Sequence, residues 1–274
     1  MTTGLPLQSG FLTVEGTRLE WRRVTPPGPR SGAPTLVLLH EGLGCAAMWK
    51  DFPEALALAT GCPVFLWSRR GFGRSDPITL PRPLDYLEQE PRLVDQVLAE
   101  ANINQCVLVG HSDGGTIALL AAGGEAASKI VGVATMAAHV FVEDVTIDGI
   151  RETKRAWDQG DLRRRLARWH GDNVDGAFRG WCDTWLDPGF RAWNIEAALS
   201  AVRAPVLVMQ GADDQYGTPA QVEAIARGVC GPARAMLIPG AGHAPHIDAP
   251  EAVIEAIRFF LAALPCAAPA GVPE

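Results

Sequence analysis

One stretch of the chain constrains the fold more than any other. Residues 106–121 read CVLVGHSDGGTIALLA: four apolar residues typical of a buried strand, then a Gly-His-Ser-Asp-Gly turn, then an apolar helical run. A turn of this kind holds its central serine in a strained backbone conformation, with the hydroxyl projecting above the sheet. Gly110 and Gly114 let the strand and the helix pass closely. The pattern predicts that Ser112 is a nucleophile at a strand–turn–helix junction.

Apolar runs and helical patterns alternate along most of the chain. The predicted strands are 11–14, 19–23, 35–39, 64–67, 106–109, 130–136, 205–210 and 233–238, and the predicted helices are 51–59, 83–101, 115–122, 222–229 and 250–261. Pro91 is expected to kink or divide the helix over 83–101. Strands that alternate with helices indicate βαβ units, so we predict an α/β fold with a mostly parallel eight-stranded sheet flanked by helices.

The segment 139–200 interrupts this alternation. It has no strand pattern, but it has charged amphipathic pieces and five of the eight tryptophans. We predict a helical cap inserted after the sixth strand, between the two parts of a core domain over 1–138 and 201–274. Large aromatic side chains suit the core of such a small bundle. Trp157, Trp181 and Trp185 are also candidates for the wall of a substrate pocket.

The same segment carries a basic cluster on one predicted helix. Its members are Arg163, Arg164, Arg165 and Arg168. Such a cluster is either a solvated helix face or a site for an anionic group, such as the phosphates of coenzyme A. Acidic residues nearby, Asp158, Asp161 and Asp172, favour the solvated face.

Composition excludes several classes of protein. The chain has 274 residues, enough for one large α/β domain, with 47% hydrophobic and 20% charged residues. The net charge is −7 and no block of like charge occurs, which argues against a nucleic-acid partner. Residues 1–10 show no signal peptide, and no apolar run reaches transmembrane length. We expect a cytoplasmic monomer or homodimer without a membrane partner, whose six scattered cysteines are reduced thiols rather than metal ligands.

A nucleophilic serine needs a base, and the base should follow a late strand. The sequence GAGHAPH over 240–246 follows the predicted strand 233–238. Its glycines allow the loop to bring the imidazole of His243 over Ser112. His246, three residues further on, is the rival base and a candidate for the pocket wall.

The base in turn needs an acid to orient it. Gly211-Ala-Asp-Asp214 directly follows the predicted strand 205–210, and the spacing favours Asp214 over Asp213, whose side chain suits a turn. An acid after strand 130–136, either Glu143 or Asp144, is the alternative.

The chemistry also needs N–H donors for a developing oxyanion. One should be the N–H of Asp113, after the nucleophile and at a helix N-terminus. We expect the carboxylate of Asp113 to turn away and stabilise that helix end. The second donor should come from the loop after the first buried strand, His40-Glu-Gly-Leu-Gly44, with Gly42 preferred over Leu43.

Taken together, these motifs resemble the α/β-hydrolase superfamily, in its serine esterase and lipase-like branch with a helical cap. The resemblance covers about residues 10–263 and rests on LHxGxG over 39–44, SRRGFGRS over 68–75, GHSDGG over 110–115, GxxD over 211–214 and Gly-His over 242–243. The order Ser112, Asp214, His243 is the Ser–acid–His order of that superfamily. The resemblance implies hydrolysis of a carboxylic ester or thioester through an acyl-enzyme, with no metal or cofactor, on a small to medium acyl substrate, aromatic or alicyclic given the tryptophans.

One departure from the superfamily bears on the pocket. Where its members usually have His-Gly after the strand, this chain has His40-Glu41. Glu41 either points into a polar network or shapes the substrate pocket. His139, which follows strand 130–136, is expected at the carboxyl edge of the sheet and is a pocket candidate. His111 is expected to be structural.

Within the superfamily some activities are disfavoured and others stay open. A serine at the turn argues against haloalkane dehalogenases and epoxide hydrolases, which use aspartate there. The His-Gly-Gly-Pro-Gly of proline iminopeptidases is absent. Carbon–carbon bond hydrolases of ring-cleavage products and cofactor-free perhydrolases share the serine triad and remain alternatives. A ligand-binding protein on a hydrolase fold is the non-enzymatic alternative.

Overall fold

The computed structural model describes residues 5–264. Its strands are β1 (Leu7–Val14), β2 (Thr17–Val24), β3 (Thr35–Leu39), β4 (Val64–Trp67), β5 (Cys106–His111), β6 (Ile130–Met136), β7 (Val206–Gly211) and β8 (Ala233–Ile238). Its α-helices are α1 (Phe52–Thr60), α2 (Tyr86–Glu100), α3 (Asp113–Ala122), α4 (Asp144–Gln159), α5 (Leu162–His170), α6 (Val174–Trp185), α7 (Pro219–Gly228), α8 (Pro245–Asp248) and α9 (Pro250–Ala263).

The strands form one sheet in the order β1-β2-β4-β3-β5-β6-β7-β8. The pairs β1–β2 and β2–β4 are antiparallel, and the remaining pairs are parallel. The predicted mostly parallel, eight-stranded α/β-hydrolase sheet is therefore confirmed. All eight predicted strands are present, and β1 and β2 form the hairpin edge.

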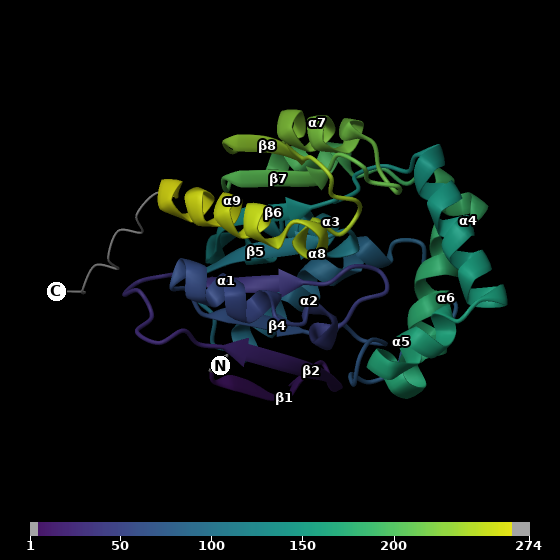
Figure 1. Ribbon diagram of the computed structural model, residues 1–274, viewed down its shortest axis with the longest axis horizontal. Coiled ribbons are helices and arrows are strands. Elements are labelled where there is room, and N and C mark those ends of the chain that lie inside the picture. The colour runs from purple at the N-terminus through teal and green to yellow at the C-terminus, as the bar shows by residue number, and fades with distance from the viewer. Residues whose placement is uncertain (1–4, 265–274) are drawn as a thin grey trace.

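The central strands are apolar along their whole length because helices cover both faces of the sheet. Val37 and Leu39 face the side packed by α2, α3 and α7, whereas Leu36 and Leu38 face the side packed by α1 and α9. Figure 1 shows α1 and α9 in front of the sheet, with α2, α3 and α7 behind it. Because helices cover both faces of the sheet, the loops that follow the parallel strands gather at its carboxyl edge.

Two helix predictions need correction. The helix predicted over 83–101 begins at Tyr86, and Pro91 neither divides it nor ends it. One missing N–H is tolerated there because Leu87 and Val94, on either side of the proline, are buried in the core and hold the helix against α3. The helix predicted to start at 115 starts at Asp113, directly after Ser112.

Residues 139–200 lie between β6 and β7 and consist of α4, α5, α6 and short 3-10 turns. Figure 1 shows the three α-helices in a column beyond the carboxyl ends of the parallel strands. Phe141 and Asn194 form an isolated antiparallel bridge, and the N–H of Ile195 donates to the carbonyl of Val140 at 2.8 Å. The two ends of the segment are thus held side by side where it leaves and rejoins the sheet. Of the predicted core domain, residues 1–4 and 265–274 lie outside the described residues.

No helix within residues 5–264 is both long enough and apolar enough to span a membrane.

Candidate active site

Ser112 occupies the turn between β5 and α3. Its backbone has φ 52° and ψ −121°, in the left-handed region that side chains disfavour. A Cβ atom at Gly110 would lie 2.2 Å from the carbonyl oxygen of Gly114, and one at Gly114 would lie 2.0 Å from the carbonyl oxygen of Leu39. Both glycines are therefore required for the strand, the turn and the helix to pack this closely.

Asp214 and His243 come from the loops after β7 and β8. Nδ1 of His243 donates to Oδ1 of Asp214 at 2.9 Å, and the N–H of Tyr216 donates to the same oxygen at 2.8 Å. The Asp214 side chain is 1% exposed. Burial raises the pKa of this carboxyl, but the hydrogen bond and charge of His243 outweigh it and bring the pKa below its ordinary value. The pair is a buried carboxylate holding one nitrogen of an imidazole.

The imidazole of His243 is held in its neutral form. Burial lowers its pKa below the ordinary value, although Asp214 opposes that shift. With the proton on Nδ1 directed at Asp214, Nε2 keeps its lone pair. A neutral imidazole of this tautomer can accept a proton, as a general base must.

A cavity of about 420 Å³ lies at the carboxyl edge of the sheet and brings most of the predicted site residues together. Its walls include the predicted residues Glu41, Gly42, Leu43, Ser112, Asp113, His139, Trp181, Trp185 and His243. Other walls that the sequence did not single out are Thr146, Ile150, Gln215, Tyr216, Gly242, Ala244, Ile247 and Asp248. Asp214 lies behind His243, outside these walls.

Two predicted pocket residues are elsewhere. Trp157 stacks on Phe178 with ring centroids 3.8 Å apart, so it belongs to the packing of α4 against α6 and is not a wall of this cavity. His246 is buried against Trp49, at 4.7 Å between ring centroids, and also lies outside the cavity walls. Burial lowers the pKa of His246 to about 3. Both predictions are wrong because the apolar packing of neighbouring elements takes up these rings.

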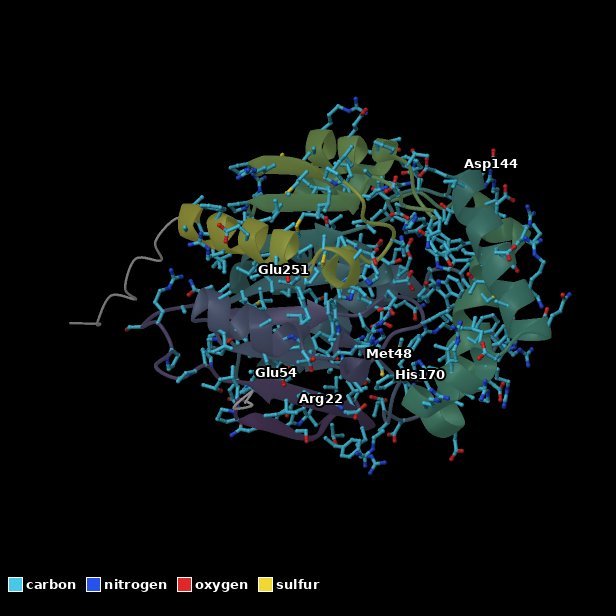
Figure 2. The ribbon with its side chains drawn as sticks, in the orientation of Figure 1. Arg22, Met48, Glu54, Asp144, His170 and Glu251 are labelled. Atoms are coloured by element: carbon cyan, nitrogen blue, oxygen red, sulfur yellow. The ribbon has the colours of Figure 1, made fainter. Side chains whose placement is uncertain are left out.

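The alternative acids are also used elsewhere. Glu143 accepts hydrogen bonds from Thr218 and Gln221. Asp144 pairs with Arg191, its side chain is 91% exposed, and Figure 2 shows it at the outer end of α4. Neither carboxylate reaches the imidazole of His243.

The two predicted oxyanion donors both border the cavity. Among residues 5–264, neither the N–H of Gly42 nor that of Asp113 is assigned a hydrogen-bond acceptor within the chain. A Cβ atom at Gly42 would lie 2.1 Å from the indole of Trp181, so only glycine fits there. The carboxylate of Asp113 turns away from the cavity and accepts a hydrogen bond from the hydroxyl of Tyr86 at 2.6 Å.

Glu41 lies in a polar cluster and also borders the cavity. Its Oε2 is 3.6 Å from Nδ1 of His111, and its carboxylate covers Gly44. Burial raises the pKa of Glu41, but the neighbouring histidines, His111 foremost, bring it well below its ordinary value. The other nitrogen of His111, Nε2, donates to the carbonyl of His243 at 2.7 Å. Glu41 and His111 together support the loop that carries His243.

His170, at the end of α5, connects two loops of the core to the helical segment, and the sequence did not single it out. The N–H of Gly73 donates to its Nδ1 at 3.0 Å, so Nε2 carries the proton and donates to the carbonyl of Leu43 at 2.9 Å. In Figure 2 His170 lies on the side of α5 that faces the core. The helical segment is thereby tied to the loop that carries Gly42. The sequence gives no signal for this contact, because His170 is simply one polar residue at the end of a charged helix.

Tyr216 is a second residue that the sequence missed. Its ring lies 4.6 Å from that of His243, and its carbonyl accepts hydrogen bonds from His139 at 3.0 Å and from Thr146 at 2.6 Å. Its position two residues after Asp214 was the available signal, because the loop that presents the acid also forms the wall beside the base.

The basic cluster of α5 lies on the surface. Arg163 pairs with Asp175, and Arg164 and Arg165 pair with Asp161, all with side chains more than half exposed. None of these arginines borders the cavity. Within the described part of the chain, no group of three or more His, Cys, Asp or Glu side chains is placed to hold a metal ion.

Comparison with known proteins places this chain in a family. Residues 36–256 match the profile of the alpha/beta hydrolase family. The chain belongs to that family, and the fold and the order of its motifs agree with it.

The curated relatives include two mammalian serine hydrolases. Serine hydrolase BPHL of Homo sapiens is 29% identical over 161 residues, an alignment that covers 55% of this chain and 53% of the human protein. Serine hydrolase BPHL of Mus musculus is 27% identical over 224 residues, covering 78% of this chain and 72% of the mouse protein. The match to the human protein spans about half of its length.

Solved structures share the fold at low sequence identity. The proline iminopeptidase of Mycobacterium smegmatis superposes with a TM-score of 0.72 at 21% identity, covering 93% of this chain and 98% of the other. The enol-lactonase of Burkholderia xenovorans LB400 gives a TM-score of 0.70 at 23% identity, covering 92% and 100%.

Proposed function

We propose that this α/β hydrolase cleaves a carboxylic ester or thioester through an acyl-enzyme on Ser112. One observation carries the proposal. One cavity is bordered by Ser112, at a strained turn, and by the neutral imidazole of His243, which a buried carboxylate holds. Two backbone N–H groups that have no acceptor among residues 5–264 border the same cavity. The similarity to two serine hydrolases supports the class of reaction.

The proposed reaction has two halves. His243 accepts the proton of the Ser112 hydroxyl through Nε2 while the serine oxygen attacks the acyl carbon. The N–H groups of Gly42 and Asp113 hold the oxyanion, and the N-terminus of α3 adds favourable potential. His243 then gives the proton to the departing alcohol or thiol. In the second half His243 activates a water molecule, which releases the acid and restores the hydroxyl.

Asp214 does not exchange protons in this scheme. Its buried carboxylate fixes the tautomer of His243 and stabilises the imidazolium that forms in each half-reaction. The low pKa of Asp214 keeps it charged throughout. The contact from the N–H of Tyr216 keeps the carboxylate aimed at Nδ1.

The cavity sets the class of acyl group. About 420 Å³ holds a small to medium substrate, and the indoles of Trp181 and Trp185 with the side chain of Ile150 supply apolar walls. Two of these walls come from α6 and one from α4. We therefore propose that residues 139–200 are a cap over the site, and that the preferred acyl groups are aromatic or alicyclic.

A panel of substrates tests the proposal. We expect turnover of p-nitrophenyl acetate, p-nitrophenyl benzoate or benzoyl-coenzyme A, with a burst of product that marks an acyl-enzyme, and no turnover by a Ser112→Ala control. Cleavage of a dienone acid without ester or thioester hydrolysis would instead indicate a carbon–carbon hydrolase. Peracid formed from acetate and hydrogen peroxide, without ester turnover, would indicate a perhydrolase. Binding of these compounds without turnover would contradict the proposal that the protein is an enzyme.

A further inference from the structure

The mechanism leaves one buried charge unused. Arg69, which follows β4, is 2% exposed and lies behind the loop that carries Gly42. A buried guanidinium requires strong partners, because removing its charge from water is costly. The partners of Arg69 are the backbone of that loop, the imidazole of His40 and the side chain of Asp113.

The carbonyl oxygen of Glu41 accepts most of the hydrogen bonds in this group. Nη2 of Arg69 donates to it at 3.0 Å and lies 3.3 Å from the carbonyl oxygen of His40. The N–H of Arg69 donates to Nε2 of His40 at 3.0 Å, so the ring proton of His40 is on Nδ1, which donates to the Glu41 carbonyl at 2.7 Å. The N–H of Gly44 adds a third donor at 3.2 Å.

The Glu41 carbonyl belongs to the same peptide group as the N–H of Gly42. Among the described residues only Leu80-Pro81 is cis, so this peptide is trans and its N–H points away from its carbonyl. Donors on the carbonyl fix the plane of the peptide with its N–H on the opposite side from Arg69. Donors on a carbonyl also polarise the peptide and strengthen its N–H as a hydrogen-bond donor.

The same guanidinium reaches the second oxyanion donor. Nη2 of Arg69 is 3.9 Å from Oδ2 of Asp113, and both side chains are 1% exposed. The hydroxyl of Tyr86 donates to that oxygen and accepts a hydrogen bond from the indole of Trp185 at 3.0 Å. The carboxylate of Asp113 is thus held by Tyr86 and Arg69, while the N–H of Asp113, which has no acceptor among residues 5–264, borders the cavity.

We propose that Arg69 is a positioning residue for the oxyanion hole: it orients and polarises the N–H of Gly42, and it anchors the side chain of Asp113, the residue that carries the second N–H. The proposal rests on the proposed function. A residue that only fills the core would contribute to stability and leave the transition state unaffected. Arg69 should instead contribute to the stabilisation of negative charge on the substrate oxygen.

Three variants separate these roles. Arg69→Lys keeps the positive charge beside Asp113 but lacks the two-pronged set of N–H donors. Arg69→Met removes the charge and the donors. The double variant Arg69→Met with Asp113→Asn also removes the negative charge of Asp113, which Arg69→Met alone would leave without its cation. Arg70→Met is the matched control, because Arg70 is the neighbouring arginine, is exposed and, among residues 5–264, donates only to the carbonyl of Pro77. The measurements are the melting temperature, kcat and KM for p-nitrophenyl acetate, and inhibition by phenylboronic acid, whose adduct with serine carries an anionic oxygen.

Loss of one oxyanion donor lowers kcat by roughly 10²–10³-fold in known cases. We expect Arg69→Met to lower kcat by about 10²-fold and Arg69→Lys by about tenfold, with little change in KM and a parallel loss of boronic acid affinity. Arg70→Met should match the wild type. A folded Arg69→Lys or Arg69→Met with wild-type kcat and boronic acid affinity would overturn the proposal. Failure of all three variants to fold would do so too, since it would show a structural role.

These results are distinct from a failure of the proposed function. A wild-type protein that hydrolyses no ester or thioester contradicts the proposed function. An active wild type with an equally active Arg69→Met contradicts only the role of Arg69.

Discussion

The loops at the carboxyl edge of the sheet and the helical segment 139–200 build the same cavity in different ways. Ser112, Asp214 and His243 each follow a parallel strand, so the sheet itself carries them to one edge. Trp181 and Trp185 come from α6, whose place depends on packing and on ties such as that of His170 to the Leu43 carbonyl. The strands position the proposed reacting groups, and the helices line the cavity beside them.

This difference divides the expected effects of substitution. Changes at the sheet edge should lower kcat for every substrate, because they remove groups that act on the reacting atoms. Changes in the helical segment should alter the ratio between substrates, because they move apolar walls.

The largest effects should come from the triad. Ser112→Ala and His243→Ala should each lower kcat by at least about 10⁴-fold on both p-nitrophenyl acetate and benzoate, and Asp214→Asn should approach 10⁴-fold because it disrupts the tautomer of His243. Steady-state kinetics on purified variants checks this. His246→Ala is the control, and a His243→Ala variant with near wild-type turnover would reassign the base to His246.

Gly42→Ala should come next. The added Cβ atom would lie 2.1 Å from the indole of Trp181, so either the oxyanion loop or α6 must shift. We expect kcat to fall by about 10²-fold, the size of one lost oxyanion donor. Gly176→Ala, on α6 with its nearest neighbour 3.7 Å away, is the matched control and should leave kcat unchanged. Equal activity of the two variants would place the oxyanion hole elsewhere.

The activity should depend on pH through His243. Only its neutral form accepts the serine proton, and burial lowers its pKa below 6.5 while Asp214 opposes that shift. The titratable side chains beside its ring include Asp214, His111, His139 and Tyr216. The value of kcat/KM should therefore fall about tenfold per pH unit below the pKa of His243, with the midpoint of the fall below pH 6.5. A midpoint at or above pH 6.5 would contradict the buried neutral base.

Stability should also fall in acid, because His246 stays neutral when folded. Its pKa is about 3 in the folded protein and 6.5 when unfolded, so below pH 6.5 the unfolded chain binds a proton that the folded chain does not. The free energy of unfolding should drop by about 1.4 kcal/mol per pH unit for this group between pH 6.5 and 3. Urea titrations at several pH values should show a shallower dependence for His246→Gln than for the wild type. Equal slopes would mean that His246 protonates within the fold.

The smallest effects should separate two tryptophans of the helical segment. Trp181→Phe should change the ratio of kcat/KM for benzoate and acetate esters, by up to about tenfold, because it enlarges the cavity. Trp157→Phe should keep that ratio within twofold while lowering stability by about 1–2 kcal/mol, because its ring only packs on Phe178. Equal changes of the ratio in both variants would remove the distinction between wall and packing.

The sequence was most informative where local rules decide the structure. Apolar runs and a hairpin pattern near the N-terminus predicted all eight strands. The Gly-His-Ser-Asp-Gly turn and the loops after two later strands predicted a serine, an acid and a base at one edge of the sheet. These predictions work because strand ends and tight turns depend on neighbouring residues.

It was least informative where distant segments meet. Arg69 contacts residues about thirty positions earlier and Asp113 farther on, and His170 contacts Leu43 across 127 positions. Trp157 and Trp181 look alike in sequence, yet Trp157 packs on Phe178 inside the segment and Trp181 lines the cavity. Which side of a helix faces a partner depends on long-range packing, and that was not predictable from the chain alone.

The most direct test of an acyl-enzyme on Ser112 is covalent labelling. The protein is incubated with a fluorophosphonate, and intact-mass and peptide mass spectrometry locate the adduct. Ser112→Ala and Arg70→Met serve as controls. An acyl-enzyme on Ser112 predicts one phosphonyl group per wild-type chain on the peptide that contains Ser112, equal labelling of Arg70→Met, and no label on Ser112→Ala. A wild-type protein that labels no better than Ser112→Ala would contradict it.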